Sequence, residues 1–538
     1  MKKILIYSMI AIFAVPISCT KNFESINTDP NASSPANFDA NFFLSNSQQS
    51  YKESIAGYAG PILFQSGWVQ ILSSTSSGGV NYYSNMDKYV PSSNTNNYAN
   101  NSWGSCYRSA SLGAEIGKIL GTDASKANVV AIGTIMKVLS LHYATDTYGD
   151  LPYSQALQGE TGLSLPVYDK QQDVYKSLLT DLEGAIAKLD ASKVKPTADL
   201  FSTNGDIAKW KRFGNSLMLR IAMRLTKADP AMAKGWAEKA YAGGAMSSVA
   251  DDVSLRGSFA TGYTNPNSRS LATAGDYYQV RWSKTLIDYL TSTNDPRISA
   301  IAEVPQAGLV ANNNIGLAGD NTAAVQRGMP NGFDFDGGAT DISKAPGYPG
   351  GTGTGGDLTP IGKYSRPRTS VYTDLNNPVS IITYAESELL LAEAAARGWN
   401  VGPVAAVHYA NGVSSGIQAL ARINANATIS AATANAYASA NPLNTSSLNA
   451  QLKMINEQYW ATTGTLMNFS EAWSNWRRSG FPVLTPVVYV GNFSGGVIPR
   501  RQIYNTDEIG RNGANYKIGV SGLTPANDGF ASRVWWDK

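Results

Sequence analysis

Apolar residues recur every three or four positions along two neighbouring stretches of the chain, which is the spacing of one face of an α-helix. The first run comprises Trp103, Tyr107, Leu112, Ile116 and then Ile119 or Leu120. The second comprises Val130, Ile135, Val138 and then Leu141 or His142. The segment 121–125 between them has turn composition. The pattern therefore predicts two adjacent helices that form a hairpin.

A second pair of stripes follows the first. One comprises Val174, Leu178, Leu182, Ile186 and Leu189, and the other comprises Ile207, Trp210, Phe213, Leu217, Ile221 and Leu225. Asp206 stands just before the latter stripe, where an aspartate caps a helix. Pro230 after Asp229 favours the start of a shorter helix over 231–242, because proline is tolerated in the first turn.

Between residues 247 and 378 the periodicity fails, except near 282–290, and glycine, proline and asparagine prevail. Long loops inside a compact protein are uncommon and are usually functional or disordered. We therefore expect a loop-rich insertion outside the core, and this is where recognition should be sought. Helical patterns return at 381–399, 403–423, 447–463 and 470–478, and the tail from Gly480 is irregular. The chain is predicted to be mainly α, with a single domain over 36–538.

The N-terminus has the pattern of a secretory signal, predicted over residues 1–18. Lys2 and Lys3 precede an apolar run over 4–17, which is shorter than the roughly 20 residues that span a bilayer. Ser18 followed by Cys19 resembles the lipobox of bacterial lipoproteins, in which cleavage leaves an acylated cysteine. We expect Cys19 to be the lipid anchor and 19–35 to be a tether. The alternative is an ordinary secreted protein with a cysteine near its cleavage site.

The amino-acid composition limits the kinds of molecule that this protein is expected to bind. The 538 residues are 43% hydrophobic and only 15% charged, so neutral polar side chains must cover much of the surface. The net charge is +3 and no basic block is present, which argues against nucleic acid. Once Cys19 is acylated, Cys106 has no partner for a disulfide and is expected to be a buried, inert thiol. No apolar run after residue 17 is long enough to cross a membrane.

The sequence offers few residues that are suited to catalysis or metal binding. Its two histidines, His142 and His408, both fall in helical stretches and are expected to be packed there. A glycosidase needs only two carboxylates, so 40 acidic residues leave that reaction open. The string 351–356 matches G-x-G-x-x-G, but flanking prolines make it a loop. Asp334 to Asp341 looks like a calcium loop without its full ligand spacing, so we expect a solvated turn. We expect no enzyme activity, cofactor or metal.

Aromatic residues in polar loops are the candidate ligand contacts, because tyrosine and tryptophan rings combine a broad apolar face with a polar edge. The candidates are Tyr82, Tyr83, Tyr89, Tyr98, Tyr277, Tyr278 and Trp282. Phe333 and Phe335 are weaker candidates. The alternative is that these rings only pack loops onto the helical body. Replacing Tyr82 and Tyr83 together by alanine is expected to weaken ligand capture by about 1 to 3 kcal/mol.

Several strings, in order along nearly the whole chain, resemble the SusD/RagB family and most closely its second SusD-like subgroup. They are 23–31 (FESINTDPN), 145–153 (TDTYGDLPY), 209–217 (KWKRFGNSL), 219–222 (LRIA), 384–386 (YAE), 392–399 (AEAAARGW), 476–482 (WRRSGFP), 498–501 (IPRR) and 533–536 (RVWW). We interpret the charged residues within these strings as structural. Glu386 and Glu393 share one helical face and Arg220 and Arg224 another, so buried pairing between them is expected.

The resemblance implies a mainly α fold with tetratricopeptide-like helix pairs and long irregular loop insertions. It also implies a lipid-anchored protein on the outer face of the outer membrane, with a SusC-like TonB-dependent transporter as partner and a glycan as cargo. A peptide or other nutrient receptor of the same architecture remains an alternative. So do a surface glycoside hydrolase and a helical scaffold without a small ligand.

Overall fold

The computed structural model describes residues 39–77, 83–92, 94–273, 280–305, 319–350 and 363–538. The chain divides into one unit over 1–40 and another over 41–538. The expected signal peptide, the anchor at Cys19 and the tether 19–35 lie outside the described residues. The second unit carries the fold.

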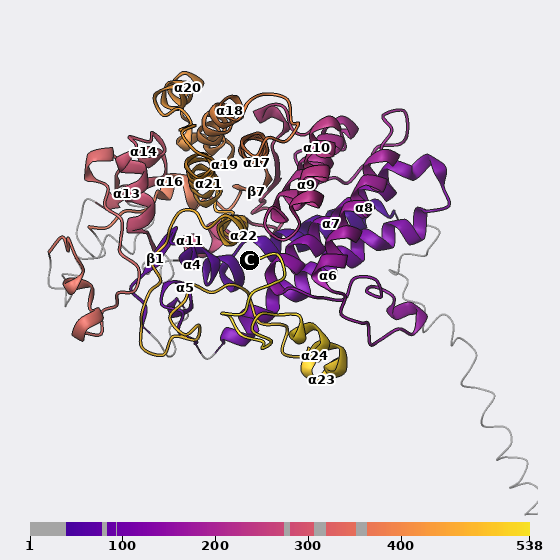
Figure 1. Ribbon diagram of the computed structural model, residues 1–538, viewed down its shortest axis with the longest axis horizontal. Helices are drawn as coiled ribbons and strands as arrows, with labels where there is room; N and C mark the ends of the chain where they lie inside the picture. The colour runs from indigo at the N-terminus through magenta and orange to yellow at the C-terminus, as the bar shows by residue number, and fades with distance from the viewer. Residues whose placement is uncertain (1–38, 78–82, 93, 274–279, 306–318, 351–362) are drawn as a thin grey trace, which may run out of the picture. The chain divides into compact units, whose positions relative to one another are not determined.

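The second unit is mostly helical (Figure 1), which confirms the expected fold class. Its N-terminal helices are α3 (Asn41–Ile55), α4 (Gln65–Trp68), α5 (Ser84–Asp87), α6 (Thr95–Leu120), α7 (Ala127–Tyr148), α8 (Gln171–Lys188), α9 (Ile207–Arg224) and α10 (Pro230–Ala242). Short helices follow: α11 (Pro266–Ala272), α13 (Lys284–Ser292), α14 (Arg297–Ile301) and α16 (Thr369–Tyr372). The C-terminal helices are α17 (Tyr384–Ala396), α18 (Ala405–Gln418), α19 (Leu420–Ile423), α20 (Ala431–Ala440), α21 (Leu448–Thr465), α22 (Phe469–Ser479), α23 (Glu508–Arg511) and α24 (Gly513–Ser521).

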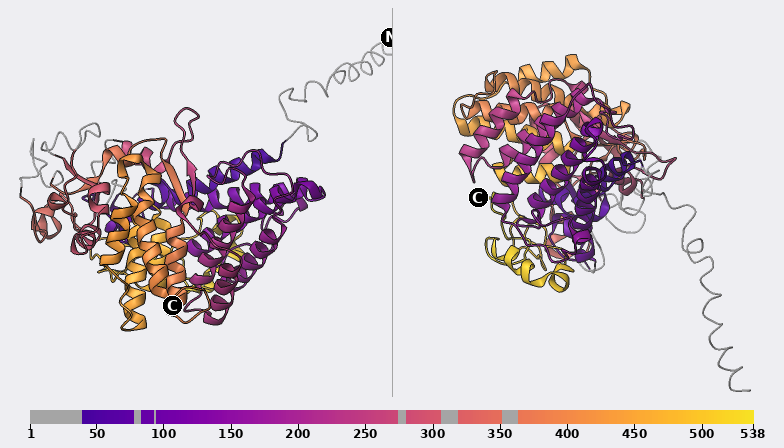
Figure 2. Two further views of the ribbon diagram at one scale, coloured as in Figure 1. Left: turned by 90° about the horizontal axis from the view of Figure 1, so that it is seen from above. Right: turned by 90° about the vertical axis from the view of Figure 1, so that its right-hand side faces the viewer.

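The long helices pack against their neighbours in the chain. In the N-terminal half α6 packs on α7, α7 on α8, α8 on α9 and α9 on α10, and α3 lies along α6. In the C-terminal half α17 packs on α18 and α21, and α20 covers α18. Figure 2 shows the two sets side by side, with α9 and α17 in contact between them. Stacked helix pairs of this kind are what the expected tetratricopeptide-like arrangement requires.

The predicted helix starts are confirmed where capping residues mark them. The Asp206 carboxylate accepts a hydrogen bond from the Lys209 amide at the start of α9. The Asp229 carboxylate accepts from the Met232 amide, with Pro230 in the first turn of α10. Each carboxylate pairs one of the amides that the first turn of a helix leaves without a partner. The sequence patterns did not predict α3, α20 or α24.

Three small antiparallel sheets join distant parts of the chain. β1 (Leu72–Ser74) pairs with β3 (Val280–Trp282). β2 (Val253–Arg256) pairs with β7 (Pro378–Ile382), with Arg256 opposite Pro378. β4 (Ala302–Pro305) lies between β5 (Gly319–Asp320) and β6 (Arg366–Pro367). Six of these seven strands lie in the region 247–378 or border it, so this region is more ordered than its sequence indicated.

Two large apolar clusters form the core. The first is centred on α3, α6 to α10 and α17. The second is built from α4, β1, β3, α13, α21 and α22, and it includes Trp282, Leu286 and Leu290. The expectation that 247–378 stays outside the core is therefore wrong for this part of the region, because short apolar segments there pack against helices far away in sequence.

Helix α7 is apolar on most of its faces, and other helices of the fold surround it. Among the described residues, one helical segment, 124–148, is long and apolar enough to cross a bilayer, and 78% of its most apolar window is buried inside the fold. Its composition is that of a core helix rather than of a membrane span. The expectation that no run after residue 17 has this length and apolarity is therefore corrected for α7.

Candidate functional site

The β1–β3 ladder pairs the strand before the first tyrosine-rich stretch of the sequence with the strand that follows the second. Ser74 at the end of β1 is opposite Val280 at the start of β3. Tyr82, Tyr277 and Tyr278 themselves lie outside the described residues.

Three of the candidate rings are buried. Trp282 is fully buried, its indole N–H donates to the Ile301 carbonyl at 3.0 Å, and its ring meets Tyr372 edge to face at 5.6 Å. Tyr89 is also fully buried, and burial raises the pKa of its hydroxyl well above the usual value. Tyr83 is almost fully buried and packs on Tyr58 at 5.7 Å. In this conformation the three rings offer no face to a ligand.

Tyr98 is only partly buried. Its ring meets the ring of Tyr58 edge to face at 5.6 Å, so Tyr58 joins Tyr98 to Tyr83 in one aromatic group. Of the candidates that the structure describes, Tyr98 alone keeps substantial exposed surface. The assignment of the seven residues as ligand contacts stays a prediction.

A buried ion pair holds α5 beside the ladder. The Lys88 ammonium donates to the Asp87 carboxylate at 3.0 Å and to the Ser74 carbonyl at 2.7 Å. Asp87 also accepts from the Ser73 hydroxyl at 3.2 Å and from the Gly332 amide at 3.1 Å. Both side chains are fully buried, and such a pair is tolerated only when additional hydrogen bonds compensate desolvation. This hydrogen-bond network holds α5 and Gly332 in place against the β1–β3 ladder.

The Asp334 to Asp341 loop satisfies its own carboxylates. Asp334 accepts from the Asp336 amide at 3.0 Å, from the Thr340 hydroxyl at 2.8 Å and from the Tyr489 hydroxyl. Phe333 and Phe335 pack, partly buried, on a small cluster around Met329 and Ile342. Across the described ranges no three His, Cys, Asp or Glu residues are placed to hold a metal ion. The glycine string 351–356 lies outside the described residues.

Both histidines are packed within helices, as expected. His142 in α7 is buried 3.4 Å from Asp146, and burial lowers the pKa of its imidazole to about 4. His408 in α18 lies 3.0 Å from the Glu388 carboxylate and 3.1 Å from the Val401 carbonyl. Cys106 is buried, and burial raises the pKa of its thiol to about 12, which suits an inert thiol.

The expected buried pairing is confirmed for Arg220 and Glu386, whose Nη2 and Oε2 atoms are 2.7 Å apart. The two other residues pair differently. Arg224 donates to Asp146 at 2.9 Å and to Glu471 at 2.5 Å. Glu393 accepts from Arg478 at 2.6 Å and from Arg397 at 2.8 Å. Arg397 is partly exposed and pairs within the end of α17, whereas the other side chains are buried and join different helices.

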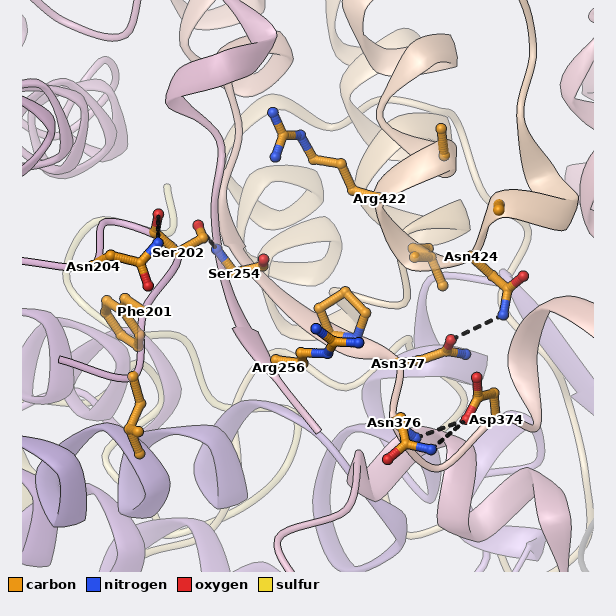
Figure 3. Close-up of a pocket in the computed structure, with 15 residues that line it drawn as sticks. Phe201, Ser202, Asn204, Ser254, Arg256, Asp374, Asn376, Asn377, Arg422 and Asn424 are labelled. Carbon is orange, nitrogen blue, oxygen red and sulfur yellow. Dashed lines mark hydrogen bonds between the residues drawn. The ribbon is translucent and has the colours of Figure 1, made fainter. Parts of the chain in front are cut away.

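A polar basin of about 490 Å³ lies on the open face of the β2–β7 ribbon (Figure 3). Along β2 the burial alternates, with Val253 and Leu255 in the core and Ser254 and Arg256 on the basin side. The remaining lining comes from segments 200–204, 374–378 and 421–425. Three regions far apart in sequence thus build one hollow around β2.

The amides in the basin are held by their neighbours. The Asn424 side chain donates to the Asn377 side-chain oxygen at 3.2 Å, and the Asn376 amide donates to Asp374 at 3.1 Å. Figure 3 shows both hydrogen bonds. In this view Arg256 lies between Ser254 on one side and the two hydrogen bonds on the other. Arg256 is exposed, and its guanidinium has no hydrogen-bond or ion-pair partner within the described part of the chain.

The second cation of the basin, Arg422, has protein partners. Arg422 lies 3.0 Å from the Asp252 carboxylate, whose other oxygen accepts from the Tyr384 amide at 2.7 Å. Burial outweighs these contacts and raises the pKa of Asp252 to about 7. Among the described residues that line the basin, Arg256 is therefore the arginine without a protein partner, and exposed Asp374 supplies a negative charge.

An aromatic hairpin continues β2 beyond Arg256. Ser258 pairs with Tyr263 across the turn, and the Gly262 amide donates to the Phe259 carbonyl at 3.1 Å. The side chains of Phe259 and Tyr263 are 66% and 51% exposed. The Phe259 amide donates to the Asn376 side-chain oxygen at 2.9 Å, so the hairpin joins the basin lining directly. Sequence reasoning missed this site, although two aromatics within a Gly-Ser-Thr turn were a readable signal.

Comparisons with known proteins identify the class. Residues 30–505 match the SusD-like_2 family, described as starch-binding and associating with the outer membrane. A solved structure named a chitin-binding protein is 30% identical, with a TM-score of 0.76, and the match covers 93% of this chain and 100% of that one. A chitin-binding SusD homolog from Flavobacterium johnsoniae is 22% identical, with a TM-score of 0.69, over 93% and 98% of the two chains. A SusD-like protein from Bacteroides thetaiotaomicron is 21% identical over 93% and 99%, with a TM-score of 0.69. No curated protein sequence matches this chain significantly.

The chain belongs to the SusD-like family, which confirms the resemblance seen in the sequence. The family description supports a glycan-binding role and an association with the outer membrane. Two of the relatives are named as chitin-binding proteins.

Proposed function

We propose that this protein is a surface-exposed lipoprotein that captures oligosaccharides and delivers them to a SusC-like TonB-dependent outer-membrane transporter. The observation that carries the proposal is the 30% identity, over nearly the whole of both chains, to a chitin-binding protein. Oligomers of N-acetylglucosamine are therefore the first ligands to test. The chemistry of the surface suits a neutral glycan, since only 15% of the residues are charged.

The proposed capture surface is the face next to the β1–β3 ladder. Tyr82, Tyr98, Tyr277 and Tyr278 would contact the sugar, because a tyrosine ring can cover the C–H face of a pyranose while its hydroxyl reaches a sugar edge. Tyr83, Tyr89 and Trp282 would support the surface from beneath, since they are buried. The proposal treats the buried rings as positioning residues.

Isothermal titration with N-acetylated chitohexaose tests the capture surface. Replacing Tyr82 and Tyr277 by alanine should weaken binding by about 1 to 3 kcal/mol, which is about 5- to 150-fold. Cellohexaose, which lacks the acetamido group, measures selectivity on the same backbone. Tyr516→Ala in α24 is the matched control and should bind like the wild type. Equal affinity of the double variant and the wild type would refute this surface.

Two assays separate the remaining alternatives. Sustained release of reducing ends from chitohexaose by the purified protein would favour a glycoside hydrolase over a binding protein. A protein that binds peptides but no glycan would be a nutrient receptor of the same architecture. Retention of a transporter in a pulldown, with no response to any glycan, would favour a scaffold.

A further inference from the structure

We propose that the basin on the β2–β7 ribbon and the hairpin 257–263 form a second oligosaccharide-binding site, separate from the β1–β3 surface. The inference rests on the proposed glycan-binding function. The site would take a neutral oligosaccharide, with Phe259 and Tyr263 stacking on sugar faces and Arg256 donating to sugar hydroxyls.

The hairpin rings are the first part of the argument. Phe42, Phe259 and Tyr263 are the aromatic side chains of the described residues that are most exposed, and two of them share one five-residue turn. The turn is held in place, because the Lys52 ammonium donates to the Tyr263 carbonyl at 3.4 Å and to the Thr264 carbonyl at 3.1 Å. Two exposed rings on a fixed turn form a preorganised apolar platform, which costs little entropy on binding.

The polar lining is the second part. The Arg256 guanidinium carries donors that no described residue uses, and Ser254 and Asn204 add a hydroxyl and an amide. The Asn376 side chain is fixed by the Phe259 amide at 2.9 Å and by Asp374 at 3.1 Å. Ordered donors in a hollow of about 490 Å³, linked through Asn376 to the turn that carries two exposed rings, match the mixed apolar and polar surface of a sugar.

Charge decides between a neutral and an acidic ligand. Arg422 lies 3.0 Å from Asp252, and Asp374 lines the same basin as Arg256. A strong anion would gain one cation and meet one carboxylate, whereas hydroxyl groups can both accept from Arg256 and donate to Asp374. The lining therefore favours a neutral, hydroxyl-rich chain.

The two surfaces are built from different parts of the fold. The basin uses β2, β7 and the segments 200–204 and 421–425, whereas the other surface uses β1, β3 and α5. None of the four candidates that the structure describes, Tyr83, Tyr89, Tyr98 and Trp282, lines the basin. Substitutions in one site can therefore be made without touching the other.

The test compares the full-length mature protein with two basin variants and two control variants by titration with N-acetylated chitohexaose and by affinity gels containing soluble neutral polysaccharides. Arg256→Ala and the double variant Phe259→Ala, Tyr263→Ala should each weaken binding at one class of site by about tenfold or more. Arg108→Ala, an exposed arginine of α6, and Ile518→Ala, a 56% exposed side chain of α24, are the controls and should match the wild type.

Because the altered side chains are exposed, melting temperatures should stay within a few degrees of the wild type. Loss of one component of a two-site isotherm, or of all binding, in both basin variants supports the site. Wild-type binding that neither basin variant changes overturns the second site but leaves the proposed function standing. A wild type that retains no glycan in either assay overturns both.

Discussion

At the scale of single residues, burial decides the chemistry of the charged groups in this protein. Arg220, Arg224, Glu386 and Glu471 lie together in the interior, and their contacts run between α9, α17 and α22. Breaking such a network by removing one partner strands a buried charge, which costs several kcal/mol. These residues are therefore structural, although their types and number would suit acid–base catalysis.

His142 links stability to pH. Burial lowers its pKa from about 6.5 to about 4, so the folded state favours the neutral imidazole while the unfolded chain takes up a proton below pH 6.5. The contribution of His142 is fully present above about pH 6.5 and is lost as the pH falls towards 4. The groups that face it are Asp146, Arg220, Arg224 and Glu471.

We expect His142→Gln to flatten this dependence. Between pH 7 and pH 4 the wild type should lose about 3 kcal/mol more unfolding free energy than the variant, at about 1.4 kcal/mol per pH unit over the window. Urea denaturation at several pH values measures the difference, and the carboxylates that do not contact His142 cancel in it. Parallel curves for the two proteins would contradict the assignment.

At the scale of elements, two glycines set the approach of α6 and α7. A Cβ atom added at Gly113 would lie 2.5 Å from the Gly133 carbonyl oxygen, and one at Gly133 would lie 2.5 Å from the Gly113 oxygen. Gly117, one turn further along α6, would place its Cβ 3.9 Å from Val130, which is ordinary contact. Only the first pair is required by packing.

Alanine at these positions should therefore have opposite effects. Gly113→Ala should destabilise the protein by about 1 to 3 kcal/mol, because the helices must separate. Gly117→Ala should stabilise it by about 0.5 to 1 kcal/mol, because alanine loses less backbone conformational entropy than glycine when the helix forms. Thermal and urea denaturation of the two variants check the signs. Destabilisation by both, or by neither, would show that the crossing is not limited by these glycines.

At the scale of the whole molecule, the fold presents neutral polar surfaces, and the proposed anchor would hold it at the outer membrane. Acyl chains contribute about 0.8 kcal/mol per buried methylene, so two or more chains anchor a protein stably. The proposed binding surfaces belong to the unit 41–538 and the proposed anchor to the unit 1–40. Retention and capture should therefore be separable.

Cys19→Ser should release the protein from membranes without changing its affinity for glycan. Fractionation of cells that express each form, with palmitate labelling, measures the anchoring, and titration of the purified proteins measures capture. Cys106→Ser is the control, since that thiol is buried and should carry no lipid. A Cys19→Ser protein that stays membrane-bound would contradict the lipoprotein assignment.

The sequence alone determined the features that depend on neighbouring residues. Helical periodicity and the capping residues Asp206 and Asp229 gave the long helices, because the contacts that form a helix reach only four residues along the chain. The ordered family strings gave the family. The packed histidines also followed, since both lie in helical stretches.

The tertiary structure decided which side chains face solvent. Trp282 and Tyr89 occur in polar loop sequence, yet they are buried because β3 and α5 pack against helices far away in the chain. The pairing of β1 with β3 and of β2 with β7 spans more than one hundred residues, and no local pattern encodes it. For the same reason the basin around Arg256 and its aromatic hairpin emerged only once distant segments were brought together by folding.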